Sequence, residues 1–306
     1  MTPSVLSSAP VPNLMSRLID GSRRVTDGPE YLAMFWAYFD DSSDEKKERF
    51  YAAGGLLNSD FVWQRFEVEW NEVMRDLEGK PFHASDCECG WGDFREWPRE
   101  KRDSLMRIAS SLIRDFDFTA YGCSVSAKDY ADIFPGHGEH DPYLLCIADC
   151  IASMAEIADV SSRQVAVYGL APNDVQFWIE ENPDTSSRAT QIFSELKAIK
   201  GWTPSARLSG IAHLGKQIVG LQAADLVARE VFKHFDNQGF RPTRKPVITL
   251  ANHATFHCWT RELLEWISKT GGPHNAEAHA MIASKIMRRP RGSNQPFAIP
   301  GEKETD

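Results

Sequence analysis

The amino-acid sequence predicts an α/β domain in which a mixed β-sheet carries helices on both faces. Two strand-like segments, residues 33–40 and 49–57, follow one another across a short polar loop, which is typical of an antiparallel hairpin. After this hairpin, segments with strand-like alternation are interspersed with segments of helical periodicity. Such a succession predicts a sheet covered by helices on both sides. Because the strands are spread along the chain, we expect one domain rather than two.

Signals for further elements follow the hairpin in a regular order. Ser59 or Asp60 is a suitable N-cap for a helix over 60–77, whose apolar residues recur at helical spacing. Pro98 suits the first turn of a helix that ends near residue 116. The other expected elements are an extended segment at 82–86, strands at 117–126, 164–170 and 205–211, helices at 142–159, 185–200 and 217–235, and peripheral helices at 260–270 and 275–289.

The ends of the chain differ in composition from its middle. Residues 1–30 are rich in Ser and Pro, and residues 291–306 combine Pro, Gly and charged residues, so we expect both to be disordered. Residues 31–290 are expected to form the single domain. No apolar stretch is long enough to span a membrane, and the N-terminus lacks the pattern of a secretory signal. These features favour a cytoplasmic protein, in which the six irregularly spaced cysteines would be reduced thiols.

The charge balance restricts the classes of nucleic-acid protein that the chain can belong to. Its formal net charge of −9 argues against a protein that coats nucleic acid, because phosphate binding draws on clustered Lys and Arg. It does not exclude a nuclease, whose acidic centre attracts phosphate once a metal ion is bound. The sequence contains no phosphate-binding Walker loop, dinucleotide fingerprint or hydrolase nucleophile elbow.

Two aspartates lie next to or within apolar segments. Asp40 ends the run 34–39, and Asp225 lies inside the largely apolar helix expected at 217–235. Ionised carboxylates rarely occupy apolar surroundings unless they are paired or bound to a cation. We therefore expect the two carboxylates to lie within about 6 Å of each other and to share a divalent metal. The structural alternative is that Asp40 begins a turn and Asp225 lies on the solvated edge of its helix.

Five sequence motifs occur in the order in which a known family has them. They are residues 39–44, 50–57, 82–86, 141–143 and 221–226. With these motifs the chain resembles the domain of unknown function 3800 family over residues 33–235, and that family is placed among proteins with an RNase H-like fold. The resemblance implies that Asp40 on the first strand and Asp225 on the last helix bind Mg²⁺ or Mn²⁺ and support phosphodiester hydrolysis.

The chain departs from the family pattern at three places. Asp41 stands where the family usually has Glu, and Ser43 stands where it usually has Gly. The segment 164–170 carries no carboxylate, although the family often places one on this strand. The residues that could supply this carboxylate are Asp174, Asp86 and Glu180, and the alternative is that the site lacks it.

The resulting prediction for the site names four metal ligands and one further catalytic residue. The expected ligands of Mg²⁺ or Mn²⁺ are Asp40, Asp225, Asp86 and Asp41. His83 is expected to act as a general base or to orient a water molecule, because the pKa of histidine lies near neutrality. The alternative for His83 is a structural residue held by hydrogen bonds.

Two further groups of residues have competing interpretations. A zinc site is not expected, because the spacing of the candidate ligands matches no standard finger. Those candidates are Cys87, Cys89, His253, His257 and Cys258. Trp91 and Trp97 either stack on nucleic-acid bases or fold against the core, and the sequence favours neither.

The sequence therefore supports two functions. The first is a divalent-metal-dependent nuclease or related phosphoesterase that acts on nucleic acid or a nucleotide, with Asp40, Asp225 and His83 as its catalytic residues. The second is a non-catalytic RNase H-like partner or regulatory protein in a defence or mobile-element system, acting through a protein partner or a homo-oligomer. The intact aspartate pair favours the first function, whereas the missing strand carboxylate and the acidic charge favour the second.

Overall fold

One mixed sheet of six strands organises the chain. The computed structural model describes residues 34–166, 174–238 and 240–287. The strands are β1 (Phe35–Ser43), β2 (Phe50–Ser59), β3 (Thr119–Ser126), β4 (Val175–Glu180), β5 (Leu208–Leu214) and β6 (Ala254–Trp259). Their order across the sheet is β5-β4-β1-β2-β3-β6. Strand β2 runs antiparallel to both neighbours, and the other pairs are parallel.

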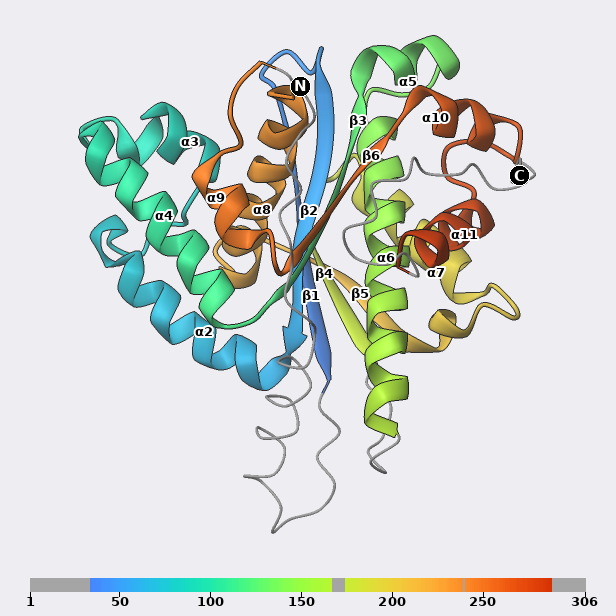
Figure 1. The fold of residues 1–306 in the computed structure, drawn as a ribbon, viewed down its shortest axis with the longest axis horizontal. Coiled ribbons are helices and arrows are strands. Elements are labelled where there is room, and N and C mark those ends of the chain that lie inside the picture. The colour runs from blue at the N-terminus through green and yellow to red at the C-terminus, as the bar shows by residue number, and fades with distance from the viewer. Residues whose placement is uncertain (1–33, 167–173, 239, 288–306) are drawn as a thin grey trace.

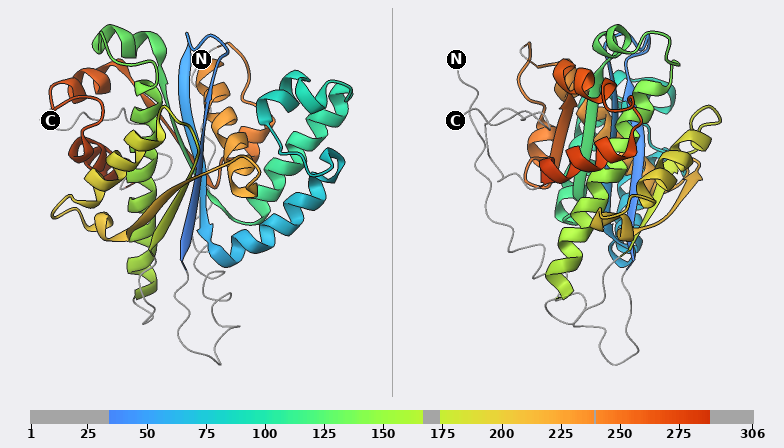
Figure 2. Two further views of the ribbon diagram at one scale, coloured as in Figure 1. Left: turned by 180° about the vertical axis from the view of Figure 1, so that it is seen from behind. Right: turned by 90° about the vertical axis from the view of Figure 1, so that its right-hand side faces the viewer.

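Helices cover both faces of this sheet (Figure 1, and from behind in Figure 2). One face carries α2 (Asp60–Val73), α3 (Ala84–Cys89), α4 (Arg99–Asp115), α8 (Val219–Asp236) and α9 (Lys245–Leu250). The other carries α6 (Asp141–Ala166), α7 (Ser186–Lys197), α10 (Arg261–Ser268) and α11 (Ala276–Met287), with α5 (Ala127–Ile133) after β3. The expected RNase H-like α/β architecture, with peripheral C-terminal helices, is confirmed.

Each face of the sheet has its own hydrophobic core, because side chains alternate between the faces along a strand. Phe39 and Phe177 point toward α6, and their rings stack with centroids 6.2 Å apart. Tyr38, one residue earlier, points to the other face and packs with Trp63 of α2. Residues that follow Phe39 and Phe177 by one position must therefore face α8.

The strand predicted at 164–170 is wrong for residues 164–166. Residues 164–166 are the last turn of α6, and residues 167–170 lie outside the described part of the chain. Val165 favours a strand locally, but a helix that has begun at Asp141 propagates through residues 164–166 at little further cost. The strand at this position in the sheet is β4, in which Val175, Phe177 and Ile179 alternate with more exposed residues.

Smaller differences concern the ends of elements and four elements that the sequence did not predict. The segment at 82–86 is extended only as far as His83, after which α3 begins. The strand expected at 205–211 is shifted to Leu208–Leu214, behind a short 3₁₀ turn. Strand β6 and the short helices α3, α5 and α9 were not predicted. The segments expected to be disordered, 1–30 and 291–306, lie outside the described residues.

None of the helices in the described ranges is both long and apolar enough to cross a bilayer.

Candidate functional site

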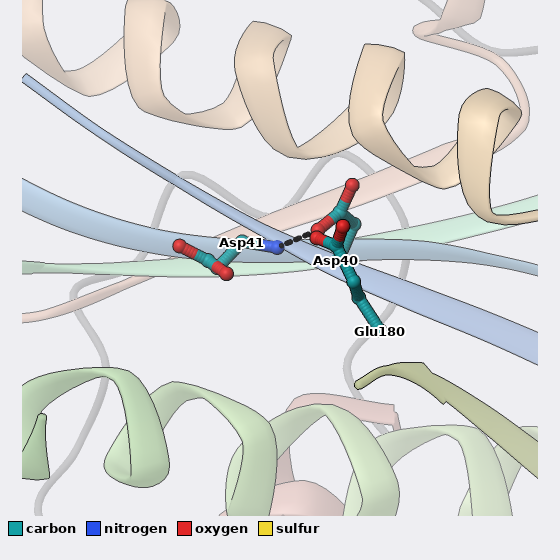
Figure 3. Close-up of side chains that lie close together, drawn as sticks. All are labelled: Asp40, Asp41 and Glu180. Atoms are coloured by element: carbon teal, nitrogen blue, oxygen red, sulfur yellow. Dashed lines mark hydrogen bonds between the residues drawn. The ribbon is translucent and has the colours of Figure 1, made fainter. Parts of the chain in front are cut away.

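Strands β1 and β4 place two carboxylates side by side. In the parallel pairing of these strands, Phe39 lies opposite Ile179. The side chains of the next residues, Asp40 and Glu180, therefore project from the same face of the sheet side by side. Both face α8, because Phe39 and Ile179 face α6. Asp40 is buried, and the backbone N–H of Asp41 donates to its Oδ1 at 2.8 Å. Figure 3 shows the carboxylates of Asp40 and Glu180 turned toward each other.

Helix α8 brings Asp225 to the same place because small residues let it approach the sheet closely. A Cβ atom built at Gly54, which pairs with Asp40 across β1 and β2, would lie 2.7 Å from the backbone nitrogen of Ala228. A Cβ atom at Gly122 would likewise lie 2.4 Å from a methyl group of Val231. The absence of these side chains leaves room for the backbone of α8, and Asp225 becomes a buried neighbour of Asp40.

A lysine ammonium lies at the centre of these carboxylates. Nζ of Lys216 contacts Oδ2 of Asp40 and lies 3.2 Å from Oε2 of Glu180 and 3.5 Å from Oδ2 of Asp225. Because one ammonium contacts both aspartates, their carboxylates lie close enough to share a single cation. Three carboxylates from β1, β4 and α8 thus converge on one cation position.

The carboxylates influence one another's ionisation. Burial, and then the neighbouring Asp225 carboxylate, raise the pKa of Asp40 well above its usual range, against the opposing effect of Lys216. Burial also raises the pKa of Asp225. Burial acts to raise the pKa of Glu180 too, but a hydrogen bond with Asp40 and the Lys216 ammonium outweigh it and lower that pKa. Asp40, Asp225 and Glu180 therefore titrate as a coupled set, in which burial and the Asp225 charge disfavour ionisation of Asp40 most strongly.

Asp41 lies at the rim of this cluster. Oxygens of Asp40, Asp41 and Glu180 lie within 4.8 Å of one another, and these three are the group of potential metal-ligating residues found in the described ranges. Figure 3 shows the Asp41 carboxylate pointing away from the other two, as alternation along a strand requires. Loss of hydration beside neighbouring protein atoms and the negative charge of Glu180 raise the pKa of Asp41 to about 6. Solvent still reaches this side chain and screens part of the repulsion between the two carboxylates.

The segment that carries His83 is docked onto α8 by two side chains of that helix. Oε1 of Gln222 accepts the backbone N–H of Phe82 at 3.1 Å, and Oδ2 of Asp225 accepts that of Ala84 at 3.0 Å. The two acceptors are three residues apart on one helix face, and the two donors flank His83. Nδ1 of His83 consequently lies 3.9 Å from Oδ2 of Asp225, on a side chain that remains open to solvent.

Asp86 does not join the carboxylate cluster, which corrects its assignment as a metal ligand. Because α3 begins at Ala84, Asp86 lies in the first helical turn instead of continuing an extended segment. Its Oδ2 lies against Gly92, 3.0 Å from where a Cβ atom of that residue would stand. The backbone carbonyl of Asp86 accepts the N–H groups of Gly90 and Trp91. These contacts give Asp86 a role in the turn that follows α3.

The residues considered for zinc lie on different sides of the sheet. Nδ1 of His257 lies 3.1 Å from Asp149 of α6, whereas the adjacent Cys258 packs on the opposite face, toward α8. Cys87 is buried under α4, where its thiol lies 3.8 Å from the carbonyl of Arg102. Because β6 is a strand, His257 and Cys258 point to opposite faces and cannot bind one ion together.

The two tryptophans of the 90–97 loop have different environments. Trp91 is exposed, whereas Trp97 packs against Phe94 with ring centroids 5.2 Å apart.

Comparison of the chain with protein-family models, with curated proteins and with solved structures found no match. The resemblance to the domain of unknown function 3800 family therefore stays a prediction that rests on its motifs.

The sequence missed one residue of the site and left another open. Glu180 was one of three candidates for the strand carboxylate, and the alternation of residues 175–180 was the signal that would have selected it. Lys216 was not predicted to take part. Its signal was its position, because it is the only charged residue in the stretch of 208–224 that leads into the helix of Asp225.

Proposed function

We propose that this protein is a divalent-metal-dependent nuclease or related phosphoesterase that hydrolyses phosphodiester bonds in nucleic acid or a nucleotide. The observation that carries the proposal is the convergence of Asp40, Glu180 and Asp225 on one cation position, beside the carboxyl end of β4 in an RNase H-like sheet. Clustered carboxylate oxygens are the ligands that Mg²⁺ and Mn²⁺ prefer. The ammonium of Lys216 at their centre supports the fit, since these residues draw a cation to this point.

The protein orients these oxygens before any ion arrives. The N–H of Asp41 holds Asp40, and the N–H of Ala84 holds Asp225, so neither carboxylate is free to rotate. A Mg²⁺ or Mn²⁺ ion bound by Asp40, Glu180 and Asp225 would supply a nucleophilic water at neutral pH and stabilise charge on the phosphate. Asp41 lies where it can accept hydrogen bonds from the outer shell of such an ion.

His83 lies on the open side of the cluster and is suited to proton transfer. Its ring is anchored beside Asp225 by the docked backbone of residues 82–84, yet part of the imidazole remains in solvent. A water or leaving group on this side would be within reach of an imidazole nitrogen, which could accept or return a proton.

A non-catalytic binding protein is the second candidate function. The observation that favours it is again Lys216, because its ammonium already neutralises the carboxylates that a catalytic metal would need. Such a protein would act through a partner or a homo-oligomer and would not require a divalent ion.

A nuclease assay with a matched pair of variants separates the two functions. Wild type should cleave members of a panel of single- and double-stranded DNA and RNA in Mn²⁺ or Mg²⁺, and EDTA should abolish cleavage. Asp225→Asn keeps the shape and removes the charge, and its amide oxygen can still accept the Ala84 N–H. Loss of one carboxylate from a cooperating set should lower the rate by several orders of magnitude.

Asp103→Asn on the exposed surface of α4 is the matched control and should retain activity. Cleavage that persists in Asp225→Asn at the wild-type rate would place the activity elsewhere. An absence of cleavage by wild type on every substrate would support the non-catalytic function.

A further inference from the structure

The lysine within the acidic site is held there by several contacts at once. Its Nζ touches carboxylates from three separate elements, and only 14% of its side chain is exposed. The usual cost of burying an ammonium is offset here by direct contact with carboxylates of Asp40, Glu180 and Asp225. The site therefore contains a cation that belongs to the protein itself.

The position of Lys216 in the chain makes this cation movable. Lys216 lies in the turn between β5 and α8, two residues after Leu214, which pairs with Glu180. The N–H of Ile218 donates to the carbonyl of Gly215 and closes this turn. Four methylene groups separate the ammonium from the backbone, so Nζ can leave the carboxylates by rotation of the side chain alone.

A divalent ion and this ammonium would compete for the same oxygen atoms. A Mg²⁺ or Mn²⁺ ion binds carboxylate oxygens at a little over 2 Å, whereas Lys216 already occupies oxygens of Asp40, Glu180 and Asp225. Two cations on one set of oxygens would lie about 4 Å apart, where their repulsion is large in a site shielded from water.

We propose that Lys216 is an internal counter-ion of the site and that its ammonium and a divalent metal exclude each other. The inference rests on the proposed function, because it concerns the same metal position. Without metal, Lys216 neutralises the converging carboxylates and keeps the site folded. Metal binding displaces the ammonium from the cluster toward solvent.

Removal of the lysine charge should therefore have opposite effects on the metal-free and the metal-bound protein. Lys216→Met keeps much of the volume and deletes the ammonium. Its affinity for Mn²⁺, measured by isothermal titration calorimetry, should be about tenfold higher than that of wild type or more. Its melting temperature in EDTA should fall, because the carboxylates lose their partner, and saturating Mn²⁺ should raise it by more than in wild type.

Two further variants control this measurement. Lys200→Met makes the same change at an exposed lysine and should bind Mn²⁺ like wild type. Lys216→Arg keeps a permanent positive charge at the site and should bind Mn²⁺ no more tightly than wild type. If Lys216→Met folds only when Mn²⁺ is present, that rescue supports the proposal. If it folds in neither condition, Lys216→Arg still provides the test, since tighter binding by this variant would contradict competition by charge.

The outcomes also separate this inference from the proposed function. Equal or weaker Mn²⁺ affinity in Lys216→Met overturns the counter-ion role, even if wild type cleaves nucleic acid. Tighter affinity in Lys216→Met without cleavage by any variant supports the counter-ion role and contradicts the nuclease. If neither wild type nor Lys216→Met binds Mn²⁺, both are wrong.

Discussion

At the scale of single residues, the site depends on which carboxylate β4 supplies. Asp174, Asp86 and Glu180 were equal candidates in the sequence, and the structure gives them different environments. Glu180 follows Ile179, which pairs with Phe39, so it emerges beside Asp40. Asp174 precedes β4 and lies at its other end, with Arg207 at 3.6 Å. The end of a parallel strand at which a carboxylate lies thus decides whether it reaches the cluster.

A matched pair of adjacent substitutions tests the role of Glu180. Glu180→Gln removes a charge that contacts Lys216 at 3.2 Å, whereas Glu181→Gln changes the neighbouring exposed residue. We expect Glu180→Gln to lower metal-dependent cleavage about 100-fold or more, as loss of one member of a cooperating set does. Glu181→Gln should remain within about twofold of wild type. Similar losses in both variants would show that Glu180 has no special role.

At the scale of elements, the approach of α8 to the sheet sets the position of Asp225. The backbone of this helix fits over Gly54, and the Val231 side chain of the helix fits over Gly122, where a Cβ atom would overlap them. One methyl group at Gly54 would need helix and sheet to separate, and close-packed interiors resist such a change. The same helix face docks Phe82 and Ala84 through Gln222 and Asp225. A shift of α8 would therefore also move His83, because Gln222 and Asp225 of this helix hold the backbone on both sides of it.

Gly54→Ala tests this linkage. The added Cβ would meet the Ala228 backbone at 2.7 Å, and overpacking of this kind costs about 1–3 kcal/mol of stability. Because the strain moves Asp225 away from Asp40, Mn²⁺ affinity should fall with stability. Gly138→Ala is the control, since its Cβ would find its nearest neighbour at an ordinary 3.6 Å. A destabilised Gly54→Ala with unchanged Mn²⁺ affinity would show that α8 can shift without disturbing the site.

At the scale of the whole molecule, a buried polar network lies on the other side of the sheet from the site. Asp149 of α6 is buried, accepts the Tyr121 hydroxyl at 3.0 Å and lies 3.1 Å from Nδ1 of His257. His279 of α11 is also buried, and its Nε2 lies 2.8 Å from the carbonyl of Pro273. Burial lowers the pKa of His279 to about 4, against the attraction of Asp149. The fold thus holds this histidine neutral.

The neutral state of His279 makes the stability of the fold depend on pH. The unfolded chain binds a proton at this residue near pH 6.5, whereas the folded chain binds it near pH 4. Between these values the unfolded state holds more protons, so stability falls as pH falls. From pH 7 to pH 5 the loss due to His279 should be about 2 kcal/mol.

Urea unfolding at the two pH values, in wild type and in His279→Gln, measures this contribution. The comparison of two proteins matters because the raised pKa values of Asp40 and Asp225 act in the opposite direction in both. The loss of stability on acidification should be smaller in His279→Gln by about the stated amount. An equal loss in both proteins would contradict a neutral buried His279.

The sequence by itself determined the class of the fold and two of the residues at its centre. The hairpin and the alternation that follows it were enough for a mixed sheet with helices on both faces, because burial periodicity is a local property of the chain. Asp40 and Asp225 were found for the same reason, since each carboxylate interrupts an apolar segment. The strand predicted to begin at residue 164 was wrong for residues 164–166, which end the long helix α6 instead.

Only the tertiary structure decided which other side chains join those two. Glu180 enters because of the register between β1 and β4, Lys216 because the turn after β5 folds back over the strand ends, and Asp86 is excluded because α3 begins two residues before it. Register, the docking of a helix and the path of a turn each depend on contacts between segments far apart in the chain. Local periodicity therefore identified the residues that need a partner, and long-range packing selected the partners.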